Sequence, residues 1–485
     1  MTVVSTDSSS VRALTRGLPT DLRQFSFHLI GIGGSGMSGL AALLLRHGAR
    51  VSGSDCNASL AIVRLLEQGA RITTRQAADA LPVDTQYVVG SAAIPEQHVE
   101  LREATRRGLP IFKYAELLGA LMRPRHGIAI SGTHGKSSTS AWLTYVLKRA
   151  GLDPSFVIGA ECDQLAGGSG VGDGPHFVAE ACEYDRSFLH LRPRSAAILN
   201  IEEDHLDYYS GLDDIVRAFE RFAAGVLDDG LIALNADDAR CRRMADTLHA
   251  PHAPVETFAI DADATWRASG LAIEDGTYGF DVSRAGRPLG RVRCGVAGRH
   301  NVTNALAVLA LANHAGVAWE RIRAALAEFR GVKRRLELRG EVAGVRVVDD
   351  YGHHPTEIRA TLQAARDRFA PQRLWCVFQP HQHSRTRFLL EDFARSFTLA
   401  DRVIVPDIYF VRDTQRDREA VSAEDLVERI RQQGGDAVYI PCLDAIAEPL
   451  SRELKAGDLV LTMGAGTIWK VADALIHRLG AELPH

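Results

Sequence analysis

The feature that most constrains the fold is an alternation of short β-branched runs with amphipathic helical stretches, from residue 25 to the end of the chain. "FSFHLIGIG", "ARVSGSD", "QYVVGSA" and "LPIFKY" are typical of strands, and "MSGLAALLLRHG" and "LAIVRLLEQG" are typical of the helices between them. Strands that alternate with helices form parallel sheets with crossover helices. The sequence therefore predicts an α/β protein.

Two interruptions divide this alternation into three segments. "LMRPRHG" breaks the pattern at Pro124, and a second series of strands begins at Gly127 and continues into a more irregular region at 250–295. The basic, helix-poor stretch "FRGVKRRLELRG" predicts a linker before a third series, which holds "VRVVDDYG", "RLWCVFQP" and "DLVLTMGAG". We expect three α/β domains, at 21–124, 125–334 and 335–485, after a disordered tail at 1–20.

Composition excludes several classes of function. The net charge of −4 over 485 residues gives no reason to expect nucleic acid or an anionic membrane as a partner. No run approaches the roughly 18 apolar residues of a membrane span, and the N-terminus lacks the apolar core of a signal peptide. The seven cysteines are scattered without a CxxC, which is typical of reduced thiols. We expect a cytoplasmic protein, monomeric or homodimeric, without nucleic acid or membrane insertion.

The stretch "GTHGKS", residues 132–137, follows an apolar run and precedes a helical stretch. It is shorter than the usual phosphate loop, because position 130 holds Ile where that pattern has Gly. The chemistry is the same: backbone N–H groups face an anion, Lys136 places a charge near the β- and γ-phosphates, and Ser137 offers a hydroxyl to Mg²⁺. We predict an ATP site here.

A second glycine loop, "GIGGSG" at residues 31–36, stands between a strand and a helix, and Asp55 follows Gly36 by 19 residues. This spacing fits a dinucleotide fingerprint, in which glycines let the backbone approach a pyrophosphate. The motif alone leaves three readings open: NAD binding, binding of another nucleotide diphosphate, and a structural strand-to-helix turn.

Acidic and imidazole groups follow two further strands of the middle segment. "VAEACEYD" places Glu180 at a strand end with Glu183 close behind, and "NIEEDHLDYY" places His205 just past another strand. Ligands of open α/β sheets gather at the carboxyl ends of strands, where the phosphate loop also lies. We predict Mg²⁺ ligation by Ser137, Glu180 and His205.

Together these stretches resemble the Mur ligases, ATP-dependent enzymes that add amino acids during peptidoglycan synthesis. The residues that carry the resemblance run from 29 to about 470: "GIGGSGMSGLA", "GTHGKSST", "EACEYDRSFLHL", "NIEEDHLDYY", "GRHNVTNALA", "VVDDYGHHPTEI", "FQPHQHSRTR" and "GAGTIW". The resemblance implies a Rossmann-like N-terminal domain for a UDP-sugar, a central P-loop ATPase-type domain, and a Rossmann-like C-terminal domain on the amino-acid side. The first loop would then hold the diphosphate of a UDP-sugar.

The implied reaction joins L-alanine to the lactyl carboxylate of UDP-N-acetylmuramate. ATP would first convert the carboxylate to an acyl phosphate, and the amine would then displace phosphate, with ATP and Mg²⁺ required. A carboxylate oxygen is a poor leaving group, and phosphorylation removes that obstacle, while metal and lysine neutralise charge on the transferred group. This role places the protein in cell-wall biogenesis, cell shape and cell division.

The resemblance assigns residues to four sites. The ATP set is Gly132, Thr133, His134, Gly135, Lys136, Ser137, Ser138, His300, Asn301, Asn304, Arg335 and Asp350. The UDP-sugar set is Gly31, Gly33, Gly34, Ser35, Gly36, Met37, Asp55, Ser91 and Ala92. The amino-acid set is Tyr351, His353, Gln382 and Arg385, and the catalytic set is Lys136, His205, His353 and Arg385.

This chain departs from the family pattern at several positions. Cys182 and Tyr184 replace a small acid and a serine in "EACEYD", and Gln382 stands where an arginine is usual. An amide there pairs more weakly with an amino-acid carboxylate, by about 1 kcal/mol, which leaves alanine, glycine and serine open as substrates. Sister ligases carry a carbamylated lysine after the metal histidine, but residues 205–225 contain no Lys. We expect no carbamate, with an acid such as Glu220 in its place.

Three alternatives remain to be weighed. A recycling ligase that attaches a tripeptide to the same UDP-sugar shares the phosphate loop. An NAD-dependent oxidoreductase would use the first glycine loop but has no role for the second. A zinc site built from His353, His354, His381 and His383 lacks an acid at a zinc-protease spacing.

Overall fold

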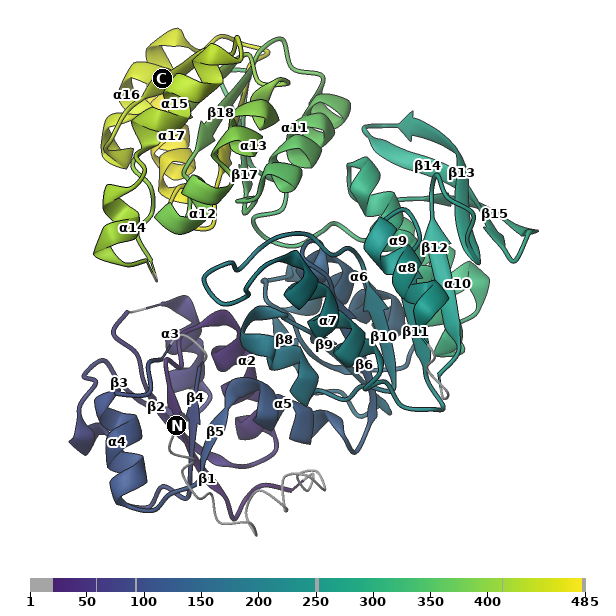
Figure 1. Ribbon diagram of the computed structural model, residues 1–485, viewed down its shortest axis with the longest axis vertical. Helices are drawn as coiled ribbons and strands as arrows, with labels where there is room; N and C mark the ends of the chain where they lie inside the picture. Colours follow the sequence, from purple (N-terminus) through teal and green to yellow (C-terminus); the bar gives the residue numbers. More distant parts are fainter. Residues whose placement is uncertain (1–20, 58, 92–93, 249–252, 412, 482–485) are drawn as a thin grey trace. The chain divides into compact units, whose positions relative to one another are not determined.

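The structure is a computed structural model that describes residues 21–57, 59–91, 94–248, 253–411 and 413–481. The chain divides into two compact units, which we describe separately (Figure 1). The first comprises Met1–Glu202, Leu212–Arg267 and Asn304–Ala325, and the second comprises Glu203–Gly211, Ala268–Thr303 and Leu326–His485. The tail predicted at 1–20 and Ala92 lie outside the described residues.

The first unit begins with a five-stranded parallel sheet in the order β3-β2-β1-β4-β5. Its strands are β1 (Ser26–Ile30), β2 (Arg50–Ser54), β3 (Arg71–Thr73), β4 (Tyr87–Gly90) and β5 (Ile111–Lys113). Its helices are α2 (Ser35–Arg46), α3 (Leu60–Glu67), α4 (Val99–Arg106) and α5 (Tyr114–Met122). Every residue of β1 is buried, as expected of a central strand covered on both faces. This strand leads directly into the first glycine loop.

A second sheet of the first unit runs in the order β12-β11-β10-β6-β9-β7-β8. Its strands are β6 (His126–Ser131), β7 (Ser155–Val157), β8 (Ser169–Gly170), β9 (His176–Glu180), β10 (Ser195–Ile198), β11 (Leu231–Asn235) and β12 (Val255–Ala259). Only β8 pairs antiparallel, with β7. The helices α6 (Lys136–Arg149), α7 (Leu212–Ala223) and α8 (Ala239–Thr247) accompany it. Because β6, β9 and β10 are parallel neighbours, the segments after them emerge at one edge.

The region expected to be irregular is mostly strand, so that prediction is wrong. β13 (Trp266–Glu274) pairs in parallel with β12 and runs into the second unit, where β14 (Thr277–Arg284) and β15 (Arg287–Arg293) form an antiparallel hairpin. The turns before β14 and β15 contain Gly276 and Gly286 at positive φ. These strands expose many polar residues, so they lack the apolar runs that identify buried strands.

The second unit contains a six-stranded sheet in the order β16-β17-β21-β18-β19-β20. Its strands are β16 (Glu337–Val342), β17 (Val345–Asp350), β18 (Leu374–Phe378), β19 (Arg402–Val405), β20 (Ala437–Tyr439) and β21 (Leu459–Met463), with only β16 antiparallel. The strand β16 occupies part of the stretch predicted to be a linker. Its helices are α11 (Pro355–Phe369), α12 (His383–Phe388), α13 (Leu390–Ala394), α14 (Gln415–Glu419), α15 (Ala423–Gln432), α16 (Ala447–Glu453) and α17 (Trp469–Ala481).

Alternate residues of the central strands enter two separate cores in this unit. Val348, Cys376 and Leu461 belong to the cluster with α11, α13 and α15, whereas Val347, Val377 and Val460 belong to the cluster with α16 and α17. Strand side chains alternate between faces, so helices on both faces are needed to bury them. The two remaining helices, α9 (Arg299–His314) and α10 (Trp319–Glu328), run from one unit into the other.

Candidate functional site

The phosphate loop predicted from "GTHGKS" joins β6 to α6, which begins at Lys136. Gly132 and Gly135 have φ values of 141° and 84°, a region that favours glycine. A Cβ on Gly135 would stand 2.9 Å from Asn304 Oδ1, so the predicted ATP residue Asn304 packs directly against the loop. The loop therefore has the glycine-dependent backbone of an anion-binding turn at a helix N-terminus.

Lys136 is held inside the loop by Glu183. Its Nζ donates to both Glu183 carboxylate oxygens, at 2.9 and 3.2 Å, and to the carbonyl oxygens of Gly132 and Thr133, at 2.6 and 3.1 Å. Burial opposes the charge on Lys136, but Glu183 and neighbouring groups together raise its pKa above the ordinary value. The lysine is a fixed cation at the place where a terminal phosphate would lie.

Ser137 and Glu180 meet beside this lysine. The Ser137 hydroxyl donates to Glu180 Oε2 at 2.8 Å, and the same oxygen accepts the Gly159 N–H at 2.8 Å. A hydroxyl and a carboxylate are oxygen donors of the kind that Mg²⁺ prefers, so this pair fits that ion. His205, the third predicted ligand, lies in the second unit on Glu203–Gly211, and its part in the metal set stays a prediction.

The remaining residues of the loop are tied to the segment after β10. The Thr133 hydroxyl accepts the Glu202 N–H at 2.8 Å, and the His134 N–H donates to Asn200 Oδ1 at 2.7 Å. His134 Nε2 also lies 3.4 Å from Glu202 Oε2. Ser138 is half-buried and is the third residue of α6. These contacts place Asn200 and Glu202 beside the phosphate loop.

The first glycine loop is anchored by Asp55. The Gly33 N–H donates to Asp55 Oδ2 at 2.9 Å, which joins the end of β2 to the loop after β1. Gly31 has a φ of 77°, and a Cβ there would lie within 3.9 Å of the side chains of Ile94 and Ser91. Gly34 precedes α2, and Met37 is buried within it. The predicted UDP-sugar residues that the structure describes thus surround one strand-to-helix turn.

Tyr114 lies against this loop and close enough to Glu180 to feel its charge, and sequence reasoning missed it. A Cβ on Gly36 would lie 3.0 Å from Tyr114 Cζ, so the ring packs on the glycine backbone. Burial, with a contribution from the Glu180 charge, raises the pKa of Tyr114. The only sequence signal was its position at the start of α5, directly after β5.

In the second unit, Asp350 and Arg335 form the centre of the predicted C-terminal ATP residues. Asp350 accepts the Leu336 and Gly352 N–H groups at 2.7 Å each, and burial raises its pKa to about 6. Arg335 Nη1 lies 3.3 Å from Glu357 Oε1. The guanidinium carbon of Arg335 lies over the Tyr351 ring, 5.3 Å from its centroid. Burial, assisted by the Arg335 charge, lowers the pKa of His300 to about 4.

Asn301, one of the predicted ATP residues, makes a hydrogen bond to the segment just before its own helix. Its Nδ2 donates to the Ala297 carbonyl oxygen at 2.6 Å, at the start of α9. In this arrangement the side chain braces its own helix. Its predicted contact with the nucleotide stays a prediction.

His353 is neutral and oriented. Its backbone N–H donates to Glu357 Oε2 at 2.9 Å, and its ring Nδ1 lies 3.1 Å from the Tyr351 carbonyl oxygen. A carbonyl oxygen only accepts, so Nδ1 carries the proton and the lone pair is on Nε2. Burial lowers the pKa of His353 to about 4. Glu357, which orients both His353 and Arg335, was missed although it lies within the "HHPTEI" motif.

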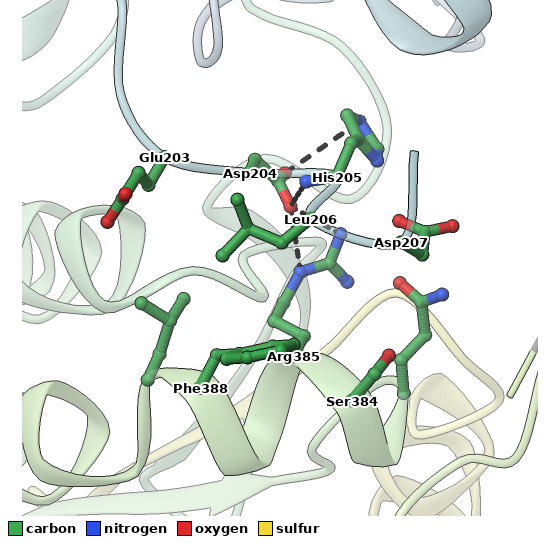
Figure 2. A pocket seen from close by; sticks show the side chains of 10 residues that line it. Glu203, Asp204, His205, Leu206, Asp207, Ser384, Arg385 and Phe388 are labelled. Carbon is green, nitrogen blue, oxygen red and sulfur yellow. Dashed lines mark hydrogen bonds and ion pairs between the residues drawn. The ribbon is translucent and has the colours of Figure 1, made fainter. Parts of the chain in front are cut away.

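Arg385 and Gln382 border a small cavity with Asp204, His205 and Ser384 (Figure 2). The cavity has a volume of about 10 Å³, close to the space of one water molecule. Arg385 Nε and Nη2 donate to Asp204 Oδ1 at 3.0 and 2.7 Å. Burial would raise the pKa of Asp204, but the Arg385 charge holds it well below its usual value. Sequence analysis missed Asp204, although it precedes the predicted metal ligand His205.

The His353 and His381 ring centroids lie 5.9 Å apart, but the four histidines of the zinc alternative also have other neighbours of their own. His383 Nδ1 lies 3.3 Å from Asp413, and His354 Nε2 lies 3.1 Å from the Glu203 carbonyl oxygen. His353 faces Tyr351, and the His381 ring stacks on Tyr409 at 5.5 Å. These orientations do not favour a shared zinc ion.

Comparison with known proteins decides the family. The UDP-N-acetylmuramate–L-alanine ligase of Pelotomaculum thermopropionicum is 45% identical over 456 residues, which cover 93% of this chain and 97% of that protein. The chain belongs to the Mur ligase family. Three Mur ligase models match successive parts: the "Mur ligase family, catalytic domain" at 26–126, the "Mur ligase middle domain" at 130–312, and the "Mur ligase, glutamate ligase domain" at 334–466.

Two solved Mur ligase structures share the fold over nearly the whole chain. UDP-N-acetylmuramate-alanine ligase MurC from Thermotoga maritima matches with a TM-score of 0.81 and 27% identity, covering 94% of this chain and 100% of that one. A murein peptide ligase from Psychrobacter arcticus matches with a TM-score of 0.71 and 27% identity, covering 95% and 100%. The resemblance and the α/β fold class predicted from the sequence are confirmed. Among the described residues, no helix combines the length and apolarity that crossing a membrane requires.

Proposed function

We propose that this Mur ligase joins L-alanine to the lactyl carboxylate of UDP-N-acetylmuramate, with conversion of ATP to ADP and phosphate. The observation that carries this proposal is the 45% identity, over nearly its whole length, to a protein of that name. The phosphate loop with its fixed lysine supports ATP as the phosphoryl donor. The proposed reaction proceeds through an acyl phosphate, which converts a poor leaving group into a good one.

The residues of the first unit have roles in the phosphoryl transfer. The first glycine loop, anchored by Asp55, holds the UDP-sugar diphosphate, and the second loop holds the ATP phosphates through its backbone N–H groups. Lys136 exchanges Glu183 for the γ-phosphate when the nucleotide binds. Ser137 and Glu180 hold Mg²⁺ in this proposal, together with His205. Bound Mg²⁺ neutralises charge on the transferred group.

The residues of the second unit serve the nucleotide and the amino acid. Arg335, Asp350, His300 and Asn301 of this unit are assigned to the nucleotide, as is Asn304 of the first unit. The His353 Nε2 lone pair can receive a proton as the amine of the amino acid attacks, because Nδ1 is already engaged. Arg385 is the cation for the carboxylate of the amino acid. Gln382 offers only a neutral amide, so glycine and serine remain candidate substrates.

Three further features belong to the proposal. The chain would act as three domains, at 21–124, 125–334 and 335–485, in the cytoplasm, as a monomer or homodimer. The contribution that a carbamylated lysine makes in sister ligases would come from an acid. Glu220 is exposed on α7 and is the acid proposed for this role.

Phosphate release from ATP tests the proposal. Release should require UDP-N-acetylmuramate and should prefer L-alanine when L-alanine, glycine and L-serine are supplied separately. Preference for glycine or serine would instead make Gln382 the determinant of a different specificity. Release only with a tripeptide would assign the chain to the recycling reaction, which the Psychrobacter likeness keeps as the second candidate.

A further inference from the structure

Arg385 already holds a carboxylate, and that carboxylate belongs to the protein. Asp204 Oδ1 accepts from both Nε and Nη2 of Arg385, which form one edge of the guanidinium (Figure 2). Both side chains are buried, with 6% and 8% of their side-chain surface exposed. The opposite nitrogen, Nη1, faces the His381 carbonyl oxygen at 3.3 Å. A guanidinium recognises a carboxylate best through one such edge, and here that edge is occupied.

The space beside this pair does not admit a second carboxylate. The cavity of about 10 Å³ has room for roughly one water molecule and not for an amino acid. Gln382 lines it and is buried, and its Nε2 has no hydrogen-bond partner among the described residues. A buried amide nitrogen without an acceptor is destabilising, because the group has lost its hydrogen bonds to water. The pocket thus has an unused donor next to a cation whose partner is internal.

We propose that Asp204 is an internal competitor of the amino acid, which must displace its carboxylate from Arg385 before binding. This inference rests on the proposed function and adds a residue that sets affinity. If the binding edge of Arg385 is free for only a fraction of the time, the apparent affinity for the amino acid is reduced by that fraction. Gln382 Nε2 then donates a hydrogen bond to the second oxygen of the incoming carboxylate, which gives this buried donor an acceptor.

Competition and simple bracing make opposite predictions for the removal of the Asp204 charge. If Asp204 only braces Arg385, D204N loosens the arginine and weakens binding of the amino acid. If Asp204 competes, D204N releases the arginine and strengthens binding. The gain should be confined to ligands that carry an α-carboxylate, because only these use the released edge. E203Q is the matched control, since Glu203 is an exposed acid of the same segment whose side chain points away from Arg385 (Figure 2).

The test is a calorimetric titration of L-alanine and of L-alaninamide into the full-length enzyme with ADP and UDP-N-acetylmuramate. D204N should lower the dissociation constant of L-alanine about tenfold, within the usual range for coupled sites. The dissociation constant of L-alaninamide for D204N should stay within about twofold of wild type. The dissociation constant of L-alanine for E203Q should also stay within about twofold of wild type. D204S is the second neutral variant if D204N does not fold. Binding that is unchanged, weaker or absent, or an equal gain for L-alaninamide, overturns the proposal. Phosphate release by the wild type is scored separately and tests the proposed function.

Discussion

Replacement of Glu100 by alanine should destabilise the sheet that carries the first glycine loop. Glu100 lies in the first turn of α4 with none of its surface exposed. Its Oε2 accepts from His28 Nε2 at 2.7 Å, from β1, and from the Ser54 hydroxyl at 2.9 Å, from β2. Both partners are fully buried. The change therefore leaves two buried polar groups without their acceptor.

The magnitude follows from these two hydrogen bonds. Each bond to a charged acceptor contributes about 1.5–3 kcal/mol, and breaking a buried ion pair costs about 3–5 kcal/mol. We expect E100A to lower the opening free energy of β1 and β2 by about 3–5 kcal/mol. At about 1.4 kcal/mol for each tenfold change, their amides should exchange hydrogen at least a hundredfold faster. Because β1 and β2 lead into Gly31 and Asp55, binding of UDP-N-acetylmuramate should weaken as well.

Hydrogen exchange followed by mass spectrometry measures this region directly. E103A is the matched control, because Glu103 lies on the same helix but pairs with Arg106 at the surface. The double change H28L/E100M should recover part of the loss, since it removes the unpaired imidazole, while the Ser54 hydroxyl still lacks its acceptor. Acceleration of less than tenfold in E100A, or equal acceleration in E103A, would refute the reasoning.

Three further predictions concern catalysis and stability. K136A should reduce phosphate release by roughly 10²–10³-fold, because it removes one preorganised charge. The control K148A changes a lysine of the same helix α6, whose ammonium lies 5.9 Å from the Phe156 ring centroid, and its rate of phosphate release should stay within about twofold of wild type. S137A should raise the Mg²⁺ concentration required for half-maximal phosphate release several-fold, since it removes one oxygen ligand, and an unchanged requirement would contradict the proposed metal set. The free energy of unfolding should fall as the pH drops from about 6.5 towards 4. Burial, with the nearby His176, Arg194 and His314 charges, lowers the pKa of His126 to about 4 in the folded state. The unfolded state therefore binds more protons in this pH window, which favours unfolding. Urea denaturation at several pH values measures this slope, and H126N should reduce it, while His300 and His353, whose pKa values are also lowered to about 4, continue to contribute.

Local sequence was sufficient for most buried strands and for both loops. β1, β6, β9, β10 and β11 are short, mainly apolar runs with mostly buried residues, as expected of strands covered on both faces. The glycines of the central loop stand where positive φ is required, so their spacing predicted the turn. The hairpin β14–β15 escaped prediction because its exposed strands alternate polar residues and have no apolar run.

Partners of functional residues were harder to predict than the residues themselves. Lys136 and Arg385 were identified from motifs, but Glu183 and Asp204, which hold them, carry no signal that separates them from solvated acids. Asp204 stands 181 positions before Arg385, and a pairing over such a distance depends on how the chain folds. The same is true of Glu100 and His28, which are 72 positions apart.

By itself, the sequence determined the α/β class, the order of the segments and the chemistry of the loops, because backbone preference and hydrophobic period act over a few residues. Only the tertiary structure decided which charge each functional side chain meets: Glu183 at Lys136, Glu180 at Ser137, Asp204 at Arg385. Electrostatic interaction depends on distance and burial in space, and neither can be read from separation along the chain.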